Sequence, residues 1–121
     1  MWRLDHVQLA IPEGAEERCD RFYVELLGFS IVIRPAPFNG RGGRWYQRDG
    51  AMIHLGVDPH FHPATKAHPA LVVDDYQALV GVLRDSGIEI RDNCDIVGTV
   101  RCHVIDPVGN RIELIDATSL Q

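Results

Sequence analysis

The stretch GNRIEL, residues 109–114, matches GAMIHL, residues 50–55, at its glycine, its isoleucine and its leucine. The match belongs to a longer frame, because the fifth residue of each stretch lies 26 positions after a glycine, Gly28 or Gly87. Each of these glycines follows a run with apolar residues at helical spacing, where a helix commonly ends. The sequence therefore predicts two copies of one unit, and the fold follows from the content of a single copy.

The first copy begins with LDHVQLAI, residues 4–11, whose alternating aliphatic side chains predict a strand with one buried face. Residues 15–28 carry apolar side chains at helical spacing and predict a helix. Further strands are predicted at residues 29–34, 44–47 and 51–57. The second copy repeats this order, with strands predicted at residues 68–73, 88–90, 100–106 and 110–116, a helix between Asp74 and Gly87, and a loop between Arg91 and Gly98.

Each copy thus reads as strand, helix and three strands, which predicts an α+β fold of two β-α-β-β-β modules. A doubly wound parallel sheet is excluded because it would alternate strand and helix throughout. One domain is expected over residues 1–121, with module one at 1–57, a junction at 58–67 and module two at 68–121.

Composition argues against nucleic-acid-binding and membrane-spanning proteins. The 121 residues carry a formal net charge of −5, whereas nucleic-acid binding needs a clustered basic excess. No apolar run approaches the length of a membrane span, so a soluble, cytoplasmic protein is expected. Three cysteines, Cys19, Cys94 and Cys102, form no CxxC pair, and their odd number favours reduced thiols.

Four side chains with metal-binding chemistry fall at corresponding places in the two copies. These candidate ligands stand on the first and last strand of each module: His6, His54, His68 and Glu113. A two-module repeat is expected to bring them together, and imidazoles with a carboxylate suit a divalent first-row metal. Any one histidine alone is more often a hydrogen-bonded structural residue, so the symmetric placement carries the prediction.

The remaining histidines are not predicted to be ligands. His60 and His62 lie in the proline-rich junction and have no counterpart in the repeat. His103 is set aside because the repeat aligns it near Arg44, which is no metal ligand. Cys102 beside His103 does not predict a nucleophile–base pair, since neighbours on a strand point to opposite faces.

Several polar and aromatic residues are candidates for substrate contacts. The glycine-rich stretch 38–44 is interpreted either as a flexible connection or as a mobile flap whose Arg41 or Arg44 binds an anionic group. Trp45 either stacks on a substrate or packs in the core. Gln8 and Arg101 are candidate polar groups of a cavity.

The doubled module, with LDHVQLAI at the start, MIHLGV at 52–57, HPALVVDD at 68–75 and DPVGNRIELID at 106–116, resembles the vicinal oxygen chelate superfamily. That superfamily includes glyoxalase I, bleomycin-resistance proteins, fosfomycin thiol transferases and extradiol dioxygenases. The resemblance covers the whole chain and implies an eight-stranded, curved mixed sheet around a cavity. It implies metal ligation by His6, His68 and Glu113, with His54 in a fourth slot where glyoxalase I enzymes usually carry glutamate. A homodimer is also implied.

The resemblance leaves the activity open. The first hypothesis is a metal-dependent lyase or isomerase, or a related transferase, on a small oxygenated substrate, with Glu113 as the base that moves the proton. The alternatives are a bleomycin-resistance-type binding protein without catalysis, an extradiol-type dioxygenase, and a scaffold whose histidines only titrate. The metal, whether Zn, Ni, Mn, Co or Fe, is not determined by the ligand types.

Overall fold

The computed structural model describes residues 1–37, 40–92 and 98–120. These residues form two compact units, Met1–Pro63 and Ala64–Gln121, which divide within the stretch 58–67. Cys94, and most of the loop predicted between Arg91 and Gly98, lie outside the described residues. Within the described part of the chain, no helix has the length and apolar character needed to cross a bilayer.

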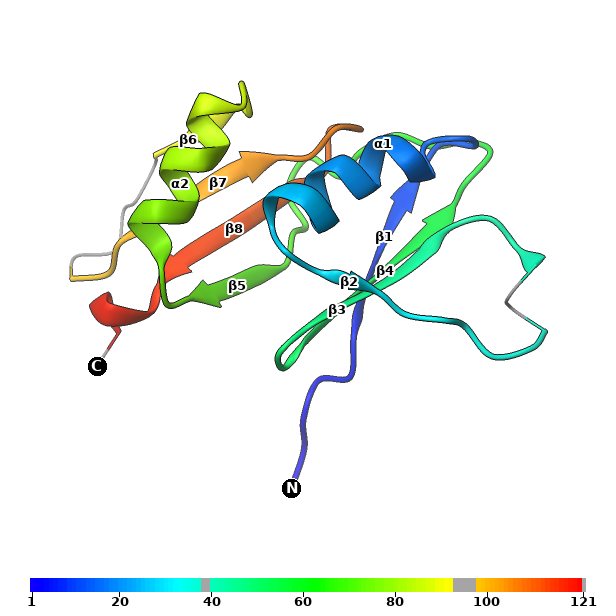
Figure 1. The fold of residues 1–121 in the computed structure, drawn as a ribbon, viewed down its shortest axis with the longest axis horizontal. Coiled ribbons are helices and arrows are strands. Elements are labelled where there is room, and N and C mark those ends of the chain that lie inside the picture. The colour runs from blue at the N-terminus through cyan, green and yellow to red at the C-terminus, as the bar shows by residue number, and fades with distance from the viewer. Residues whose placement is uncertain (38–39, 93–97, 121) are drawn as a thin grey trace. The chain divides into compact units, whose positions relative to one another are not determined.

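Each unit contains one β-α-β-β-β module, which confirms the predicted α+β fold (Figure 1). The elements of the first unit are β1 (Val7–Ile11), α1 (Glu16–Asp20), η1 (Arg21–Leu26), β2 (Ser30–Ile31), β3 (Arg44–Arg48) and β4 (Ala51–Val57). Those of the second are β5 (Ala70–Val73), α2 (Tyr76–Asp85), β6 (Ile90–Arg91), β7 (Arg101–Ile105), β8 (Arg111–Asp116) and the short helix η3 (Ala117–Ser119).

The eight strands make two four-stranded mixed sheets, in the orders β1-β4-β3-β2 and β5-β8-β7-β6. In both sheets the first strand of the module runs parallel to the last, and the other pairs are antiparallel. The last strand of each module therefore lies inside its sheet with a neighbour on either side, so a side chain on it is well positioned to meet residues from both neighbours.

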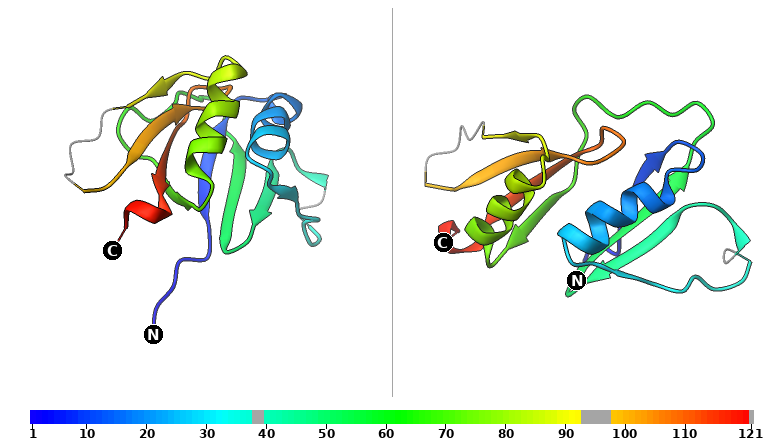
Figure 2. Two further views of the ribbon diagram at one scale, coloured as in Figure 1. Left: turned by 60° about the vertical axis from the view of Figure 1, so that its left-hand side comes forward. Right: turned by 45° about the horizontal axis from the view of Figure 1, so that its top comes forward.

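One face of each sheet packs against the helix of its own module (Figure 2). In unit one this face buries Tyr46, Ile53 and Leu55, and in unit two Cys102, Val104, Ile112 and Leu114. Each fully buried aliphatic side chain stabilises the fold by roughly 1.5–3 kcal/mol. Because a slip of one residue would turn this apolar set to the opposite face, the packing also fixes which side chains lie on the other face.

The helix predicted at residues 15–28 has an unexpected second half. After α1, the turn η1 is a π-helix, in which the Leu27 amide donates to the Phe22 carbonyl five residues back at 2.9 Å. This wider turn accommodates two consecutive buried aromatic side chains, Phe22 and Tyr23, at the sheet. The helix ends at Gly28, as predicted, with a φ of 78° that glycine adopts readily.

Candidate metal centre

Glu113 occupies the middle of β8, between β5 and β7. Its neighbours Ile112 and Leu114 are fully buried on the helix side, so strand alternation sends Glu113 to the opposite face. The residue is only 8% exposed, and its amide donates to the Pro69 carbonyl at 2.9 Å. A carboxylate this buried needs partners, and the neighbouring elements supply them.

His68 lies two residues before β5 rather than on the predicted strand. Its Nδ1 is 2.7 Å from the Lys66 carbonyl oxygen, and its Nε2 is 2.9 Å from Glu113 Oε1. Because a carbonyl only accepts, Nδ1 carries the proton, and in the neutral ring Nε2 presents its lone pair to the carboxylate. A backbone carbonyl that fixes the second ring nitrogen in this way is typical of metal-ligating histidines.

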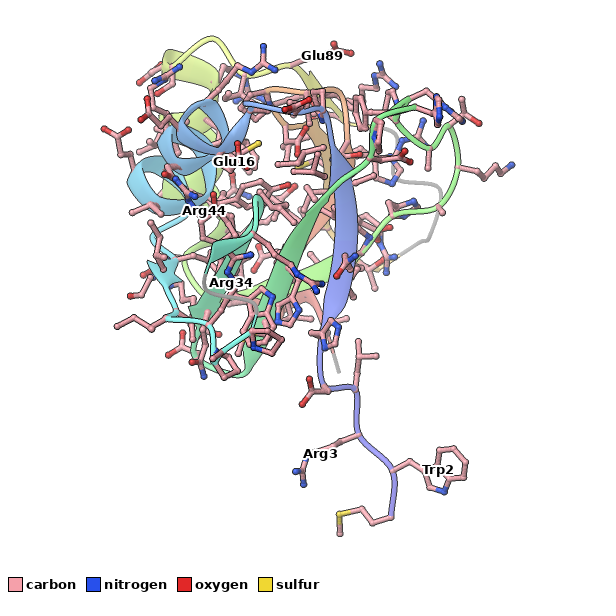
Figure 3. All side chains as sticks on the ribbon, turned by 90° about the vertical axis from the view of Figure 1, so that its right-hand side faces the viewer. Trp2, Arg3, Glu16, Arg34, Arg44 and Glu89 are labelled. Atoms are coloured by element: carbon pink, nitrogen blue, oxygen red, sulfur yellow. The ribbon has the colours of Figure 1, made fainter. Side chains whose placement is uncertain are left out.

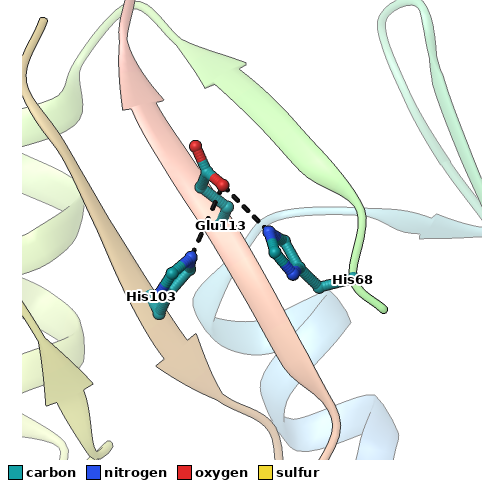
Figure 4. Close-up of side chains that lie close together, drawn as sticks. All are labelled: His68, His103 and Glu113. Carbon is teal, nitrogen blue, oxygen red and sulfur yellow. Dashed lines mark hydrogen bonds and ion pairs between the residues drawn. The ribbon is translucent and has the colours of Figure 1, made fainter. Parts of the chain in front are cut away.

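His103, on β7, faces Glu113 directly across the antiparallel ladder. Its Nε2 lies 3.4 Å from the same carboxylate oxygen, Oε1. Figure 4 shows the three side chains arriving from β7, from β8 and from the segment before β5. One ligand atom from each residue lies within 4.8 Å of the other two, which makes His68, His103 and Glu113 a possible metal-binding group.

Arg101 holds the second oxygen of the carboxylate. Its Nη1 donates to Glu113 Oε2 at 2.7 Å, and its Nη2 donates to Thr99 Oγ1 at 3.2 Å. Burial raises the pKa of the Glu113 carboxyl, but the hydrogen bond that His68 donates when its Nε2 is protonated, together with that of Arg101, outweighs burial, so the pKa lies below its ordinary value. The carboxylate is therefore ionised near neutral pH, with Oε2 taken by the guanidinium and Oε1 turned to the two imidazoles.

This donor set fits a divalent metal. Two imidazoles and one carboxylate are the ligands that first-row metals take in sites with open positions for a substrate. In the neutral forms of the rings, the His68 Nε2 lone pair and Glu113 Oε1 would repel each other at 2.9 Å unless a cation or a proton lies between them. The arrangement therefore suits a bound cation.

The structure brings His103 to Glu113, although the repeat alignment sets it aside, and turn length explains the difference. The first hairpin turns through Asp49 and Gly50, whereas the second needs the three residues 107–109, because the Asp106 amide donates to the Asn110 carbonyl. One additional residue shifts the alignment, so that His103 corresponds to Trp45 rather than to Arg44. A comparison of the turns DG and PVG in the two hairpins would have revealed this from the sequence.

Module one carries a stack of rings at the positions equivalent to the metal-binding group. The His54 ring lies between His6 and Trp45, with ring centroids at 3.9 and 4.2 Å and interplanar angles of 17° and 5°. Burial, and then the neighbouring His6, lower the pKa of His54. His6 lies one residue before β1, and its Nδ1 is 2.8 Å from Asp5 Oδ2. Convergence of His6 and His54 with the ligands of the other unit stays a prediction.

The structure places the candidate substrate residues of module one differently. Gln8 is exposed on the face of His54, above Gly56, where a Cβ would lie 2.6 Å from Gln8 Nε2. Arg44 lies on the helix face instead, and it donates to both oxygens of Asp20 at 3.0 Å (Figure 3). We therefore interpret Arg44 as a structural residue rather than a substrate ligand.

The described part of the glycine-rich stretch, residues 40–44, is held to the module by hydrogen bonds. Arg34 donates to the Arg41 and Gly42 carbonyls, and the Gly43 amide donates to Glu16 Oε2 at 2.8 Å. Gly43 has a φ of 99°, and a Cβ there would lie 2.2 Å from the Leu55 carbonyl oxygen. These contacts favour a fastened connection over the mobile flap that would present Arg41.

His60 and His62 are exposed in the junction and make local contacts. The His60 amide donates to Asp58 Oδ1 at 2.9 Å, and His62 Nδ1 lies 3.3 Å from the His60 carbonyl. Their position agrees with the interpretation of both as loop residues.

Comparison with known proteins identifies the family. No protein-family model matches the sequence, and neither does any curated protein. A solved structure of a protein assigned to the glyoxalase family, from Bacillus anthracis, is 38% identical over 96% of this chain and 95% of that chain, with a TM-score of 0.91. The chain belongs to the glyoxalase family. This places it in the vicinal oxygen chelate superfamily, as the sequence resemblance predicts.

More distant solved structures share the glyoxalase fold alone. A glyoxalase/dioxygenase from Nostoc punctiforme is 20% identical over 94% of this chain and 90% of that chain, with a TM-score of 0.78. TnmS3, an antibiotic binding protein from Streptomyces, is 23% identical over 96% and 98%, with a TM-score of 0.66. The fold therefore occurs in proteins named as enzymes and in a protein named for binding.

Proposed function

We propose that this glyoxalase-family protein binds one divalent metal ion through His68, His103 and Glu113 and acts as a lyase or isomerase on a small oxygenated substrate. The observation that supports it most is the approach of two imidazole Nε2 atoms to a single carboxylate oxygen, at 2.9 and 3.4 Å. A metal bound there would act as a Lewis acid and polarise a substrate carbonyl. Open coordination positions would take two adjacent substrate oxygens.

The protein's own groups would then move the proton. Glu113 Oε1 is the proposed acceptor of a proton from the substrate carbon beside the carbonyl. The Arg101 guanidinium on Oε2 keeps the carboxylate in one orientation and ionised. Glu113 Oε1 would leave the metal to take this proton while His68 and His103 hold the ion through their Nε2 atoms, and the same oxygen would return the proton to the neighbouring carbon of the product.

Metal content tests the proposal first. Protein loaded with a mixture of Zn, Ni, Mn, Co and Fe salts and then dialysed should retain close to one metal per chain by plasma mass spectrometry. The Glu113→Gln variant should retain little, while Glu89→Gln, an exposed carboxylate of the same module, should match the parent. No retained metal in the parent would contradict the metal site.

The activity is tested on the loaded protein with small carbonyl compounds that carry two adjacent oxygens, alone and as thiol adducts. Turnover that depends on the metal, and that disappears in Glu113→Gln assayed with enough added metal to fill its weakened site, supports Glu113 as the base. Turnover unchanged in that variant excludes Glu113 from the role. Oxygen uptake with catechols would instead indicate a dioxygenase.

A second candidate function is small-molecule binding without catalysis. The contact that favours it is the Arg101–Glu113 ion pair at 2.7 Å, which neutralises the carboxylate without any metal. Ligand-induced increases in melting temperature would then be the same with and without chelator. An increase in melting temperature that disappears when chelator is added would instead support the metal-dependent site.

We further propose that the protein works as a homodimer in the cytoplasm. The family resemblance supports the dimer, and the buried cysteines Cys19 and Cys102, which form no disulfide, support a reducing compartment. Light scattering coupled to size exclusion measures the mass directly. A mass of about 27 kDa, twice the 13.6 kDa chain, is expected.

A further inference from the structure

Arg111 lies two residues before Glu113 on β8 and shares its face of the sheet, because side chains alternate along a strand. Its partner across the ladder is Ile105, on the strand that also carries His103. Arg111 is half-buried, whereas the adjoining Ile112 is fully buried on the helix side. A guanidinium thus lies on the same face as the metal-binding group, one step along the strand.

The other charged groups of this face are already paired. Glu113 binds Arg101 at 2.7 Å, and Glu89 binds Arg91, which faces His103 across the ladder, also at 2.7 Å. Among residues 1–37, 40–92 and 98–120, the Arg111 guanidinium has no ion pair or side-chain hydrogen bond. It is therefore the cation of this face whose charge no carboxylate of the described chain balances.

The charge of the face is opposite to that of the protein. The chain as a whole carries −5, yet the paired charges on this face cancel and leave Arg111 in excess. A half-buried guanidinium gains most from an anion with two coplanar oxygens, which accept its two parallel N–H bonds. A substrate carboxylate supplies that geometry.

We propose that Arg111 binds a carboxylate of the substrate, so that the site takes small carboxylic acids whose further oxygens lie next to the metal-binding group. The proposal rests on the proposed function for the role of those further oxygens. Arg101 is unsuited to the same task because Glu113 and Thr99 already occupy its guanidinium. Arg111 thereby sets substrate class, while the two histidines and Glu113 carry the chemistry.

Oxalate is the probe, since it combines a carboxylate with two adjacent oxygens. Its dissociation constant is measured by titration calorimetry on metal-loaded parent, Arg111→Gln and Arg111→Lys proteins. The matched control is Arg84→Gln, which removes an exposed arginine of the same module that is paired with Asp92 at 3.8 Å. Metal content is determined on every sample.

Arg111→Gln should weaken oxalate binding by about 10–100-fold, because a charge-assisted hydrogen bond contributes roughly 1.5–3 kcal/mol and about 1.4 kcal/mol is tenfold. Arg111→Lys should lose less oxalate affinity, since lysine keeps the positive charge but cannot donate the two parallel N–H bonds of a guanidinium. Arg84→Gln should stay within about twofold of the parent, with metal content equal in all four proteins. Equal oxalate affinity in parent and Arg111→Gln overturns the proposal.

The metal measurement separates the two proposals. If the parent retains no metal, the proposed function fails, and oxalate is titrated into metal-free protein instead. A loss of affinity in Arg111→Gln alone then still upholds the carboxylate site. If metal-free parent does not bind oxalate, or binds it as tightly as metal-free Arg111→Gln does, the carboxylate site is overturned as well.

Discussion

Modules one and two place different side chains at three equivalent positions of their two four-stranded sheets. Module two has His68, His103 and Glu113, and module one has His6, Trp45 and His54. In module two both imidazoles turn a nitrogen toward one carboxylate oxygen. In module one three rings lie face to face, with centroids 3.9 and 4.2 Å apart.

The difference shows how one carboxylate changes the use of a scaffold. Nitrogen lone pairs lie in the ring plane, so stacked imidazoles direct them along parallel planes rather than toward a common point. A carboxylate between two imidazoles instead attracts their N–H or metal-binding edges. The sheet supplies the positions in both modules, and the last strand's central residue, His54 or Glu113, decides what they can bind.

Removing the Glu113 carboxylate should abolish the metal binding that distinguishes module two from module one, and this is the largest effect expected. Glu113→Gln should weaken metal binding by more than about 100-fold, because even outer-shell changes cost about 10–100-fold. Competition with a fluorescent chelator measures the affinity, and circular dichroism checks the fold. Glu89→Gln, with its carboxylate on Arg91, should leave the affinity unchanged.

Replacing one histidine in each module, His103 on β7 and His54 on β4, tests whether the metal site belongs to module two. His103→Gln should weaken metal binding by at least about 10-fold, whereas His54→Gln should change it by less than about twofold. The same competition assay applies to both variants. The reverse result, with His54 essential and His103 dispensable, would restore the ligand set expected from the family resemblance.

The arrangement of module two can also be built into module one. The double variant Trp45→His and His54→Glu, beside His6, should bind a second metal ion. Its affinity should be about 10–100-fold weaker than at module two, because Gly43 stands where Arg101 holds the carboxylate in module two. Mass spectrometry of the loaded protein counts the metals. A single metal in the double variant would mean that side-chain identity alone does not explain the difference.

The smallest expected effect is the pH dependence of the free energy of unfolding that arises from His54 in the ring stack of module one. Burial and His6 hold the pKa of His54 below its ordinary value of 6.5, so the unfolded chain takes up the proton first as the pH falls. The free energy of unfolding should therefore decrease as the pH drops through 6.5 toward the folded-state pKa. Urea unfolding between about pH 7.5 and 5.5 measures it, with free histidine titrating in that range. His54→Phe should flatten this part of the curve, and an equal slope in both proteins would contradict the assignment.

Much of the fold could be predicted because its signals are local. Alternation marks β1, β4 and β8, helical spacing marks α2, and glycines mark the helix ends. The π-helical turn η1 was missed because its apolar spacing closely resembles that of an α-helix. Strand β2 begins one residue and β6 two residues after the predicted start. Their boundaries depend on which residues pair with the neighbouring strand, and the local sequence does not show this.

The candidate site could be predicted only in part. His68 and Glu113 meet, as the repeat suggests, at 2.9 Å. His103 was missed because one additional turn residue reverses the face on which it lies. The contact of Arg44 with Asp20, 24 residues away in sequence, could not be read from the local pattern.

The sequence by itself determined two α+β modules, the strand that carries Glu113, and the family to which the chain belongs. The tertiary structure decided that Oε1 of Glu113 faces two imidazoles, that Arg101 binds Oε2, and that the Arg111 guanidinium has no ion pair or side-chain hydrogen bond within the described chain. The reason is that helical and strand periodicity depends only on residues close together in the sequence. The register between strands depends on turn length and on packing across the sheet, and a shift of one residue exchanges its two faces.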